Sequence, residues 1–325
     1  MTFKKYFYLS IIFPACIIAI IVSFNIYMNE YGLFGNAKGK SIKIWHNERA
    51  SKYLLSCNYI PANFEGIIIG PSLSDNLDTK KISGFKIYNA SIRGGNVSEL
   101  KSIAENIIQK GNLKFIIICL DPYITKNHEH KTSSMSRQEY WGSLGSKQIL
   151  KIYCEKLFIK LNARYDIYND YGYNNFNLTE EKQTDIIKKS TKSLNNNKEK
   201  DETKDSSETV EFIDEVAYKD LSQIVNLSRQ RGVKIFGFYY AYYIQNYSEA
   251  KFKSYKNKID RIFTNQDVIW NMNTDEYYNF RNDPSNYYDK SHLSWKGADF
   301  LIREINNKLN MFYGRRLRDI NLPRS

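Results

Sequence analysis

The sequence is poor in the residues that usually build disulfide frameworks and metal centres. Only four of its 325 residues are cysteines and only four are histidines. Cys57, Cys119 and Cys154 show neither paired spacing nor a Cys-x-x-Cys motif, which indicates no disulfide framework and no zinc site of that type. His128 and His130 form a His-x-His pair, but no third ligand can be identified for it, and we predict no metal and no other cofactor.

The sequence also lacks the signatures of nucleic-acid binding. Lysine and arginine number 47 against 35 aspartates and glutamates, which gives a net charge of +12 and an isoelectric point near 9.2. Such a charge suits an anionic neighbourhood: nucleic acid, phospholipid headgroups or an acidic surface polymer. A glycine-aromatic motif and a dense basic helix are both absent, and the basic residues are spread along the chain, so nucleic acid is the least favoured of these partners.

Charge is absent from residues 6–29, which read YFYLSIIFPACIIAIIVSFNIYMN. About 20 residues of helix cross a bilayer core, so this run predicts a membrane span. Two lysines precede it and Glu30 follows it, which favours a cytoplasmic segment 1–5 and an exported body. A cleaved signal peptide or a buried helix of a soluble domain are the alternatives. No small-x-small cleavage site follows the run and Cys16 lies in its middle, so we expect an uncleaved single-pass anchor.

Five short apolar runs follow, each of the length of a buried strand. They lie at residues 64–70, 85–91, 114–121, 233–240 and 267–273. Continuous runs rich in β-branched residues are typical of parallel strands that are covered on both faces. Helical patterns precede the third and fourth runs, at 98–111 and 218–232, and each closes on a glycine. This alternation predicts a three-layer α/β/α sandwich with a mostly parallel, five-stranded sheet, preceded by one transmembrane helix.

The remaining segments complete the predicted domain organisation. Residues 30–63 predict a linker and an amphipathic helix around HNERASKYLLS. We expect the α/β domain to occupy residues 64–315, to close with a helix that begins at WKGADF, and to be followed by a basic tail at 316–325. Residues at about 180–211 are polar, mixed in charge and almost without aromatics, which predicts a solvated or disordered insertion.

Ser72 follows the first predicted strand, in the stretch GPSLSDN. In an open parallel sheet, ligands bind at the carboxyl ends of the strands, so site residues are expected in the loops there. A serine at a tight strand-to-helix turn exposes its hydroxyl, and the backbone N–H groups after it point at the same space, as an activated nucleophile requires. The alternative is that Ser72 or Ser74 caps the following helix, and the short motif alone favours capping.

The loops after the second and third strands offer further candidates. Gly94 and Gly95 stand in NASIRGGNVSEL. Paired glycines allow close backbone approach and can donate an N–H group to a developing oxyanion; alternatively, the loop simply needs a positive φ. Asp121, in LDPYITKNHEH, can either orient a neighbouring side chain or begin a turn before Pro122.

Asp289 and His292 follow the fifth strand, in YYDKSHLSWKG, at the same predicted edge of the sheet as Ser72. A carboxylate, an imidazole and a hydroxyl can therefore converge there. Their chemistry is nucleophilic acyl transfer: Ser72 attacks, His292 takes and returns the proton, and Asp289 fixes the imidazole tautomer and stabilises its charged form. The alternative is a polar loop that caps the last helix.

These motifs resemble the SGNH/GDSL hydrolase superfamily, which implies an SGNH or flavodoxin-like fold. The blocks that carry the resemblance are GPS at 70–72, YNASIRGG at 88–95 and DKSH at 289–292. The closer resemblance is to the membrane-anchored members found in bacterial cell-surface polysaccharide and teichoic-acid modification, such as the D-alanyl-lipoteichoic acid biosynthesis protein and the alginate acetylation proteins. KFIIICLDPY and FRNDPSNYYDKSHLSWKG look like their third-strand and C-terminal blocks, and the resemblance covers about 64–125 and 212–310.

Two positions depart from the pattern of that superfamily. Pro71 stands where an aspartate is usual between glycine and serine, which leaves nucleophile, base and orienting acid unchanged. The third block reads LDPY and lacks the Gly-x-Asn-Asp that supplies the superfamily's asparagine oxyanion donor. The backbone N–H groups of Leu73 and of Gly94 or Gly95 are then the expected oxyanion donors.

The resemblance implies a serine acyl-esterase or O-acyltransferase, held in the cell membrane with its catalytic domain on the extracytoplasmic side. Its substrate would be an acylated surface glycan or a lipid-linked glycan precursor. If the acyl group arrives from inside the cell, the resemblance implies a membrane-bound O-acyltransferase as partner.

The alternative is a non-catalytic protein of the same fold that binds polysaccharide or an assembly partner. The missing asparagine and the 26 tyrosines favour it, because aromatic faces suit sugar rings. The anchor argues against a soluble intracellular lipase.

Overall fold

The computed structural model describes residues 3–44, 48–126, 144, 150–151, 153–154, 168–174, 213–289 and 291–320. The polar insertion predicted at about 180–211 lies outside the described residues, and so do His128 and His130. The segment predicted as a basic tail, 316–325, is described as far as Ile320, where the last helix ends.

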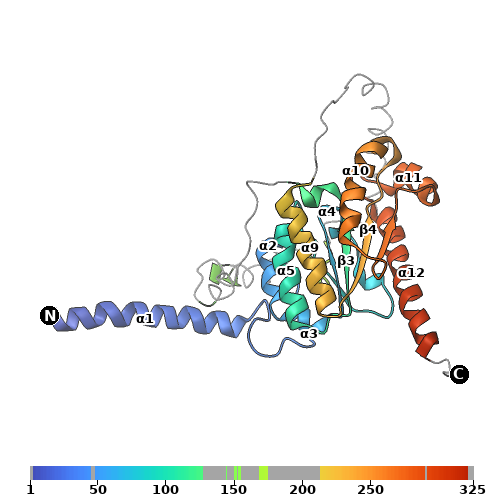
Figure 1. Cartoon of the computed structure of the whole chain (residues 1–325). Helices are drawn as coiled ribbons and strands as arrows, with labels where there is room; N and C mark the ends of the chain where they lie inside the picture. The colour runs from blue at the N-terminus through green and yellow to red at the C-terminus, as the bar shows by residue number, and fades with distance from the viewer. Residues whose placement is uncertain are drawn as a thin grey trace, which may run out of the picture.

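The N-terminal helix α1, Phe3–Met28, is long and apolar enough to cross a membrane. It projects away from the rest of the fold as a single helix (Figure 1), and none of its most apolar window is buried in protein. Apolar side chains without a protein partner are favourable in lipid and unfavourable in water. An N-terminal signal sequence can also form an apolar helix, so length and composition make α1 a candidate membrane span and no more.

One sheet of five parallel strands forms the centre of the fold, in the order β2-β1-β3-β4-β5. The strands are β1 (Gly66–Ile69), β2 (Ile87–Asn89), β3 (Phe115–Leu120), β4 (Lys234–Tyr239) and β5 (Val268–Asn271). Each lies inside one of the five predicted apolar runs, which confirms the predicted fold class. The direction of winding reverses at β1, which pairs with β2 on one side and β3 on the other. Such a reversal opens a crevice at the carboxyl ends of the strands.

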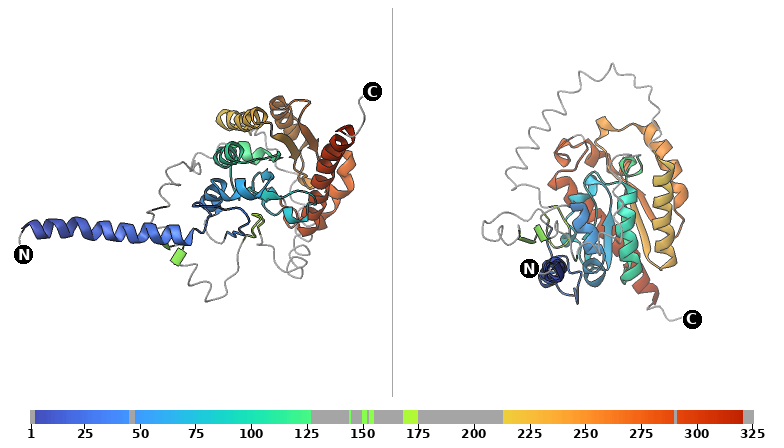
Figure 2. Two further views of the ribbon diagram at one scale, coloured as in Figure 1. Left: turned by 90° about the horizontal axis from the view of Figure 1, so that it is seen from below. Right: turned by 90° about the vertical axis from the view of Figure 1, so that its left-hand side faces the viewer.

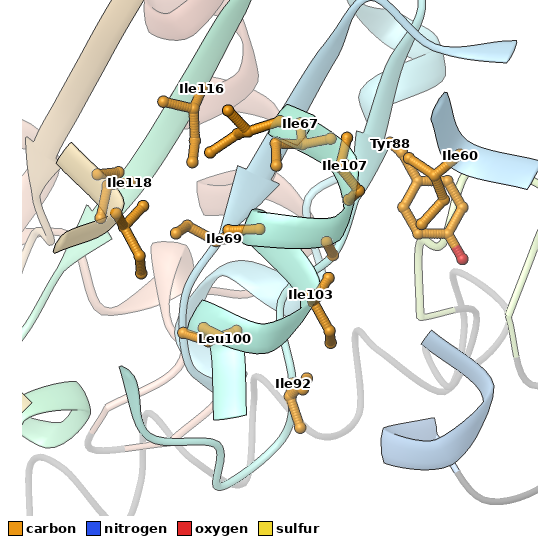
Figure 3. Packing of buried hydrophobic residues seen from close by; sticks show 14 of the residues in the cluster. Ile60, Ile67, Ile69, Tyr88, Ile92, Leu100, Ile103, Ile107, Ile116 and Ile118 are labelled. Carbon is orange, nitrogen blue, oxygen red and sulfur yellow. The ribbon is translucent and has the colours of Figure 1, made fainter. Parts of the chain in front are cut away.

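A layer of helices covers one face of the sheet. These helices are α2 (Glu48–Ser56), α3 (Tyr59–Asn63), α5 (Val97–Lys110), α9 (Glu215–Gln230) and α10 (Glu249–Ile259). Ile67 and Ile69 of β1 point to this side and belong to the same buried cluster as Ile103 and Ile107 of α5 (Figure 3). Alternate side chains of a strand point to opposite faces, which is why Ile67 and Ile69 belong to this cluster and Ile68 does not.

The other face of the sheet packs on α12 (Trp295–Ile320) and α11 (Tyr278–Asn282). Ile68 of β1 and Ile117 of β3 point to this side, where Leu301 of α12 is fully buried. The sheet thus lies between two helical layers (Figure 2), as a three-layer α/β/α sandwich requires.

The segment between α1 and β1 is part of the hydrophobic core. Tyr31, Leu33 and Ile42 are buried in the same cluster as α5 and α9. The amphipathic helix predicted around HNERASKYLLS is α2, and its buried face includes Lys52, which has no exposed surface. The residues expected to form a linker therefore also help to build the α/β core.

Short elements and caps set the ends of the helices. The 3₁₀ helices are η1 (Thr79–Lys81), η2 (Pro122–Thr125), η4 (Ile244–Asn246), η5 (Asp260–Ile262), η6 (Asp275–Tyr277) and η7 (Pro284–Asn286). Asn96 and Glu99 form a reciprocal capping box at the start of α5. Gly232, which follows α9, has a φ of +70°, in the left-handed region that favours glycine. Gly111, which follows α5, has a φ of −99°, a backbone angle that other residues also adopt.

Candidate active site

Ser72 is the first residue of the short helix α4 (Ser72–Asp75), directly after the turn that ends β1. Gly70 makes that turn possible. A Cβ at this position would lie 2.6 Å from the Cβ of Cys119 and 2.3 Å from the hydroxyl oxygen of Ser74, closer than side chains can approach. The missing side chain therefore lets the chain turn tightly against β3 and places Ser72 at the carboxyl edge of the sheet.

Neither serine of α4 caps the helix. Pro71 is the N-cap residue, and no side chain makes a capping hydrogen bond there. The hydroxyl of Ser74 donates to the carbonyl of Pro71, 3.2 Å away. The capping alternative that the motif favoured is therefore wrong for Ser72 and for Ser74 in this structure.

Ser72, His292 and Asp289 form one chain of hydrogen bonds. The hydroxyl oxygen of Ser72 lies 2.9 Å from Nε2 of His292. On the other side of the ring, Nδ1 lies 2.9 Å from Oδ2 and 3.1 Å from Oδ1 of Asp289. A neutral imidazole that donates its Nδ1–H to the carboxylate presents an unprotonated Nε2 to the hydroxyl, which is the tautomer that can accept a serine proton. The catalytic roles assigned to the three residues stay predictions.

The environment of Asp289 favours its ionised form. Its Oδ1 accepts hydrogen bonds of 2.7 Å from the backbone N–H groups of Ser291 and His292. Partial burial acts to raise the pKa of Asp289, but the hydrogen bonds from the His292 ring and from these two N–H groups outweigh it and hold the pKa below its usual value of 3.8. Asp289 is therefore an anion at neutral pH and a suitable partner for an imidazolium.

The loop that carries His292 is held from several sides. The ring of Tyr288 stacks on the imidazole, with 5.3 Å between centroids and 16° between planes. The N–H of Leu293 donates to the hydroxyl of Tyr240 at 2.9 Å, and the side-chain amide of Asn76 donates to the Leu293 carbonyl at 2.8 Å. Because Asn76 directly follows α4, this last bond fixes the histidine loop to the helix that begins with Ser72.

The three candidate oxyanion donors differ in their environments. Gly94 has φ +60°, a conformation that favours glycine, and it lines the same cavity as Ser72 and Leu73. The N–H of Gly95 instead donates to the carbonyl of Ile92 at 3.0 Å, which closes a turn. An N–H group committed to that turn is not directed at a substrate, so Gly94 and Leu73 remain the candidates.

Asp121 begins a turn and also binds a tyrosine. It is the N-cap of η2, where its Oδ1 accepts the Tyr123 N–H at 2.7 Å, and its Oδ2 accepts the hydroxyl of Tyr242. Burial raises the pKa of Asp121 above its usual value, although the hydrogen bond from Tyr242 acts to lower it. The turn was one of the two roles predicted for this residue.

A cavity of about 590 Å³ opens beside the Ser72–His292 pair, and both residues line it. Its walls include four aromatic side chains and two cations: Tyr123, Tyr242, Tyr247, Phe252, Arg93 and Lys126. A cavity of this volume is in the range of small-ligand sites. None of these six residues was predicted from the sequence as a site residue, although the position of Tyr242 just after β4 is a signal for it.

A buried ionic network that was not predicted from the sequence joins α2 to α4. Lys52 of α2 donates to Asp75 of α4 at 3.0 Å, to Glu48 at 3.1 Å and to the carbonyl of Ser91. Full burial raises the pKa of Asp75 to about 6, and the nearby positive charge of Lys52 acts against this rise. The only sequence signal was a lysine on the apolar face of an amphipathic helix, which by itself does not identify its partners.

The residues that the structure describes contain no group of three or more histidine, cysteine, aspartate or glutamate side chains that could hold a metal ion. Cys119 is fully buried in the core. The predicted absence of a metal and of other cofactors stays a prediction.

No family model matches the sequence, and no curated protein matches it either. Among solved structures, the fold is similar to that of a protein from Streptococcus pneumonia provisionally named a platelet activating factor, with a TM-score of 0.44 and 12% sequence identity. That similarity covers 81% of this chain and 91% of the other. A likeness this distant carries no argument about activity.

Proposed function

We propose that this protein is a membrane-anchored serine acyl-esterase or O-acyltransferase that works through an acyl-Ser72 intermediate. The observation that carries the proposal is the hydrogen-bonded chain from Ser72 through His292 to Asp289, beside a cavity that the serine and the histidine both line. A hydroxyl, an imidazole in the correct tautomer and an ionised carboxylate are the parts that nucleophilic acyl chemistry needs.

In the first half of the proposed reaction, the oxygen of Ser72 attacks the carbonyl carbon of an ester and its proton passes to Nε2 of His292. Asp289 stabilises the imidazolium that results, and the N–H groups of Leu73 and Gly94 stabilise the oxyanion. The tetrahedral intermediate then breaks its bond to the alcohol oxygen. The departing alcohol takes the proton from Nε2, which leaves acyl-Ser72 and a neutral imidazole.

In the second half, water or a sugar hydroxyl attacks the acyl carbon and gives its proton to Nε2 of His292. The bond between the acyl group and the Ser72 oxygen breaks, and the serine recovers its proton from the imidazole. Water as acceptor gives hydrolysis and a free acid, and a sugar hydroxyl gives transfer. Both routes balance without any further reactant.

The proposed substrate is an acylated cell-surface glycan or a lipid-linked glycan precursor. Four aromatic side chains in the cavity wall support a sugar substrate, because aromatic rings pack against the apolar faces of sugars. The net charge of +12 suits an acidic polymer. As a candidate membrane span, α1 supports an enzyme that is held at a membrane. The proposed side of the catalytic domain is extracytoplasmic, because Lys4 and Lys5 precede the uncharged run at 6–29. A membrane-bound O-acyltransferase is the proposed partner for acyl supply.

Labelling by a fluorophosphonate tests the proposed nucleophile. The full chain in detergent micelles should gain one adduct by intact mass, and peptide mapping should place it on Ser72. His292→Ala should abolish the labelling. Ser248→Ala is a matched control, because Ser248 also lines the cavity but lies outside the hydrogen-bonded chain, and it should label like the wild type. A folded wild type that never labels, or that labels equally well without His292, would contradict the proposal.

The aromatic side chains in the cavity wall also support a second candidate function, a non-catalytic protein that binds polysaccharide. In that case Tyr247→Ala should weaken glycan binding, measured by calorimetry, and Ser72→Ala should leave binding unchanged. Neither the wild type nor any variant should then react with the fluorophosphonate. Serine reactivity therefore separates the two functions.

A further inference from the structure

We propose that Arg49, on helix α2, is a positioning residue that aims the Gly94 N–H at the developing oxyanion. This inference rests on the proposed function and deepens it, because it assigns part of the catalytic geometry to a helix outside the predicted α/β domain. Helix α2 precedes β1, and its first turn carries Glu48 and Arg49 towards the loop after β2.

The guanidinium of Arg49 binds two consecutive carbonyl groups of that loop. Its Nη2 donates to the carbonyl of Arg93 at 2.9 Å and to that of Gly94 at 3.0 Å. Its Nε donates to the carboxylate of Glu99 at 2.7 Å, and Glu99 is itself 4% exposed and fixed by the capping box of α5. The guanidinium is therefore anchored on one side and holds the loop on the other.

The position of the Arg93 carbonyl decides where the Gly94 N–H points. Both groups belong to the same peptide unit, and a trans peptide directs its C=O and its N–H to opposite sides. Since the carbonyl is held against Arg49, the Gly94 N–H faces away from α2, and Gly94 lines the cavity together with Ser72. Hydrogen bonding to the carbonyl also polarises the peptide unit, which makes its N–H a better donor.

Two further contacts make α2 the common support of both oxyanion donors. Glu48 accepts the Arg93 N–H at 3.3 Å, so the peptide units on both sides of this residue are bound to α2. Lys52, which has no exposed surface, donates to Asp75 in α4, the helix that supplies Leu73. One turn and a half of α2 thus holds the Gly94 loop and α4 in a fixed relation.

The test is steady-state kinetics with an activated acetyl ester, using the full chain in detergent micelles. Arg49→Ala should lower kcat by about 10- to 100-fold with KM nearly unchanged, because a misdirected oxyanion donor acts on the transition state and not on substrate binding. Added guanidinium ion should restore part of the lost kcat, since the Arg49 side chain is 33% exposed and its place is open to solvent.

Arg229→Ala is the matched control. Arg229 is 30% exposed, pairs with the carboxylate of Asp267 and donates to the carbonyl of Ile262, so it resembles Arg49 in its contacts but does not line the cavity. It should keep kcat within about twofold of the wild type and should not respond to guanidinium. A wild-type kcat in Arg49→Ala, or an equal loss of kcat in both variants, would overturn the proposal.

Arg49→Lys carries the test if the alanine variant does not fold. It keeps the ion pair with Glu99 but lacks the planar fork, so we expect a several-fold loss of kcat at unchanged KM. Wild-type kcat in this variant would also overturn the proposal.

Hydrogen exchange separates a failure of this inference from a failure of the proposed function. Amides in residues 90–96 should exchange faster in the Arg49 variants than in the wild type, whether or not the protein is an esterase. If the wild type has no esterase activity, the proposed function fails, and the role of Arg49 in orienting an oxyanion donor fails too. Faster exchange in the Arg49 variants would then still show that Arg49 holds the loop of Arg93 and Gly94. Unchanged exchange in an active enzyme would overturn the inference alone.

Discussion

The imidazole Nε2 of His292 lies 2.9 Å from the hydroxyl oxygen of Ser72, although 220 residues separate the two along the chain. Ser72 follows β1 and His292 lies beyond β5, with β3 and β4 between these strands in the sheet. The two residues meet because the chain after β5 returns across the carboxyl edge and is tied to α4 through Asn76 and Leu293. This geometry, the apolar helix α1, and the packing around Gly70 and Asp75 lead to four predictions.

The first concerns the additivity of mutations in the hydrogen-bonded chain. Ser72→Ala, His292→Ala and Asp289→Asn should each lower ester turnover by about 1,000-fold or more without loss of the fold. The double variant Ser72→Ala/His292→Ala should be no less active than the single ones, because a base without its nucleophile has nothing to activate. Initial rates with an activated ester and circular dichroism of each variant check this. Losses that multiply would show that the residues act independently.

The second concerns membrane topology. Lys4 and Lys5 lie in the first turn of α1, just before its uncharged stretch at 6–29, and the candidate site lies far after that stretch. A reporter fused to the C-terminus should therefore behave as exported, and the protein should stay in the membrane fraction at full mass. A reporter that is active only in the cytoplasm would refute the orientation, and a shortened soluble product would indicate a cleaved signal sequence.

The third concerns the turn before Ser72. A methyl group at position 70 would meet Cys119 at 2.6 Å, so Gly70→Ala should destabilise the protein by about 1–3 kcal/mol and lower the reactivity of Ser72. Gly314→Ala in α12 is the control, because nothing lies within 4 Å of its Cβ position. In a helix the control should be neutral or slightly stabilising. Equal stability of both variants in a urea titration would contradict the close packing at Gly70.

The fourth concerns the pH dependence of stability at Asp75. Burial raises its folded-state pKa to about 6, whereas an unfolded aspartate has a pKa of about 3.9. A group with a raised pKa stabilises the fold below its unfolded pKa, and that contribution is lost as the pH rises through the folded value. The free energy of unfolding of the wild type, relative to that of Asp75→Asn, should therefore fall between about pH 4 and about pH 6.

Urea denaturation of both full-length proteins in detergent, at a series of pH values across this window, measures the difference. Burial acts to raise the pKa of Glu48, but its interactions with Lys52 lower it below the usual value. Protonation of Glu48 therefore destabilises the fold at acid pH, which is the opposite direction to Asp75. This effect occurs in both proteins, because Glu48 is present in both. A difference that stays flat or rises with pH would contradict the raised pKa of Asp75.

Local sequence patterns determined the elements of this fold and the positions of the candidate site residues along the chain. Each strand lies within a predicted apolar run, since burial of a strand on both faces demands continuous apolar residues and leaves a local signal. Parallel strands bring their following loops to one edge, so Ser72, Gly94 and His292 could be assigned to a common edge before the order of the strands was known.

Only the tertiary structure decided which groups in those loops bind one another. That the N–H of Gly95 closes a turn, that Asp121 accepts a hydrogen bond from Tyr242, and that Arg49 holds the Gly94 loop all depend on contacts between distant segments. In the sequence, Lys52 is one polar residue in an amphipathic helix. In the structure it can be buried because the carboxylates of Glu48 on α2 and Asp75 on α4 lie within 3.1 Å of its ammonium group. Periodicity reports which face of a helix is buried, but hydrogen bonding within that face depends on the three-dimensional positions of partners far away in the chain.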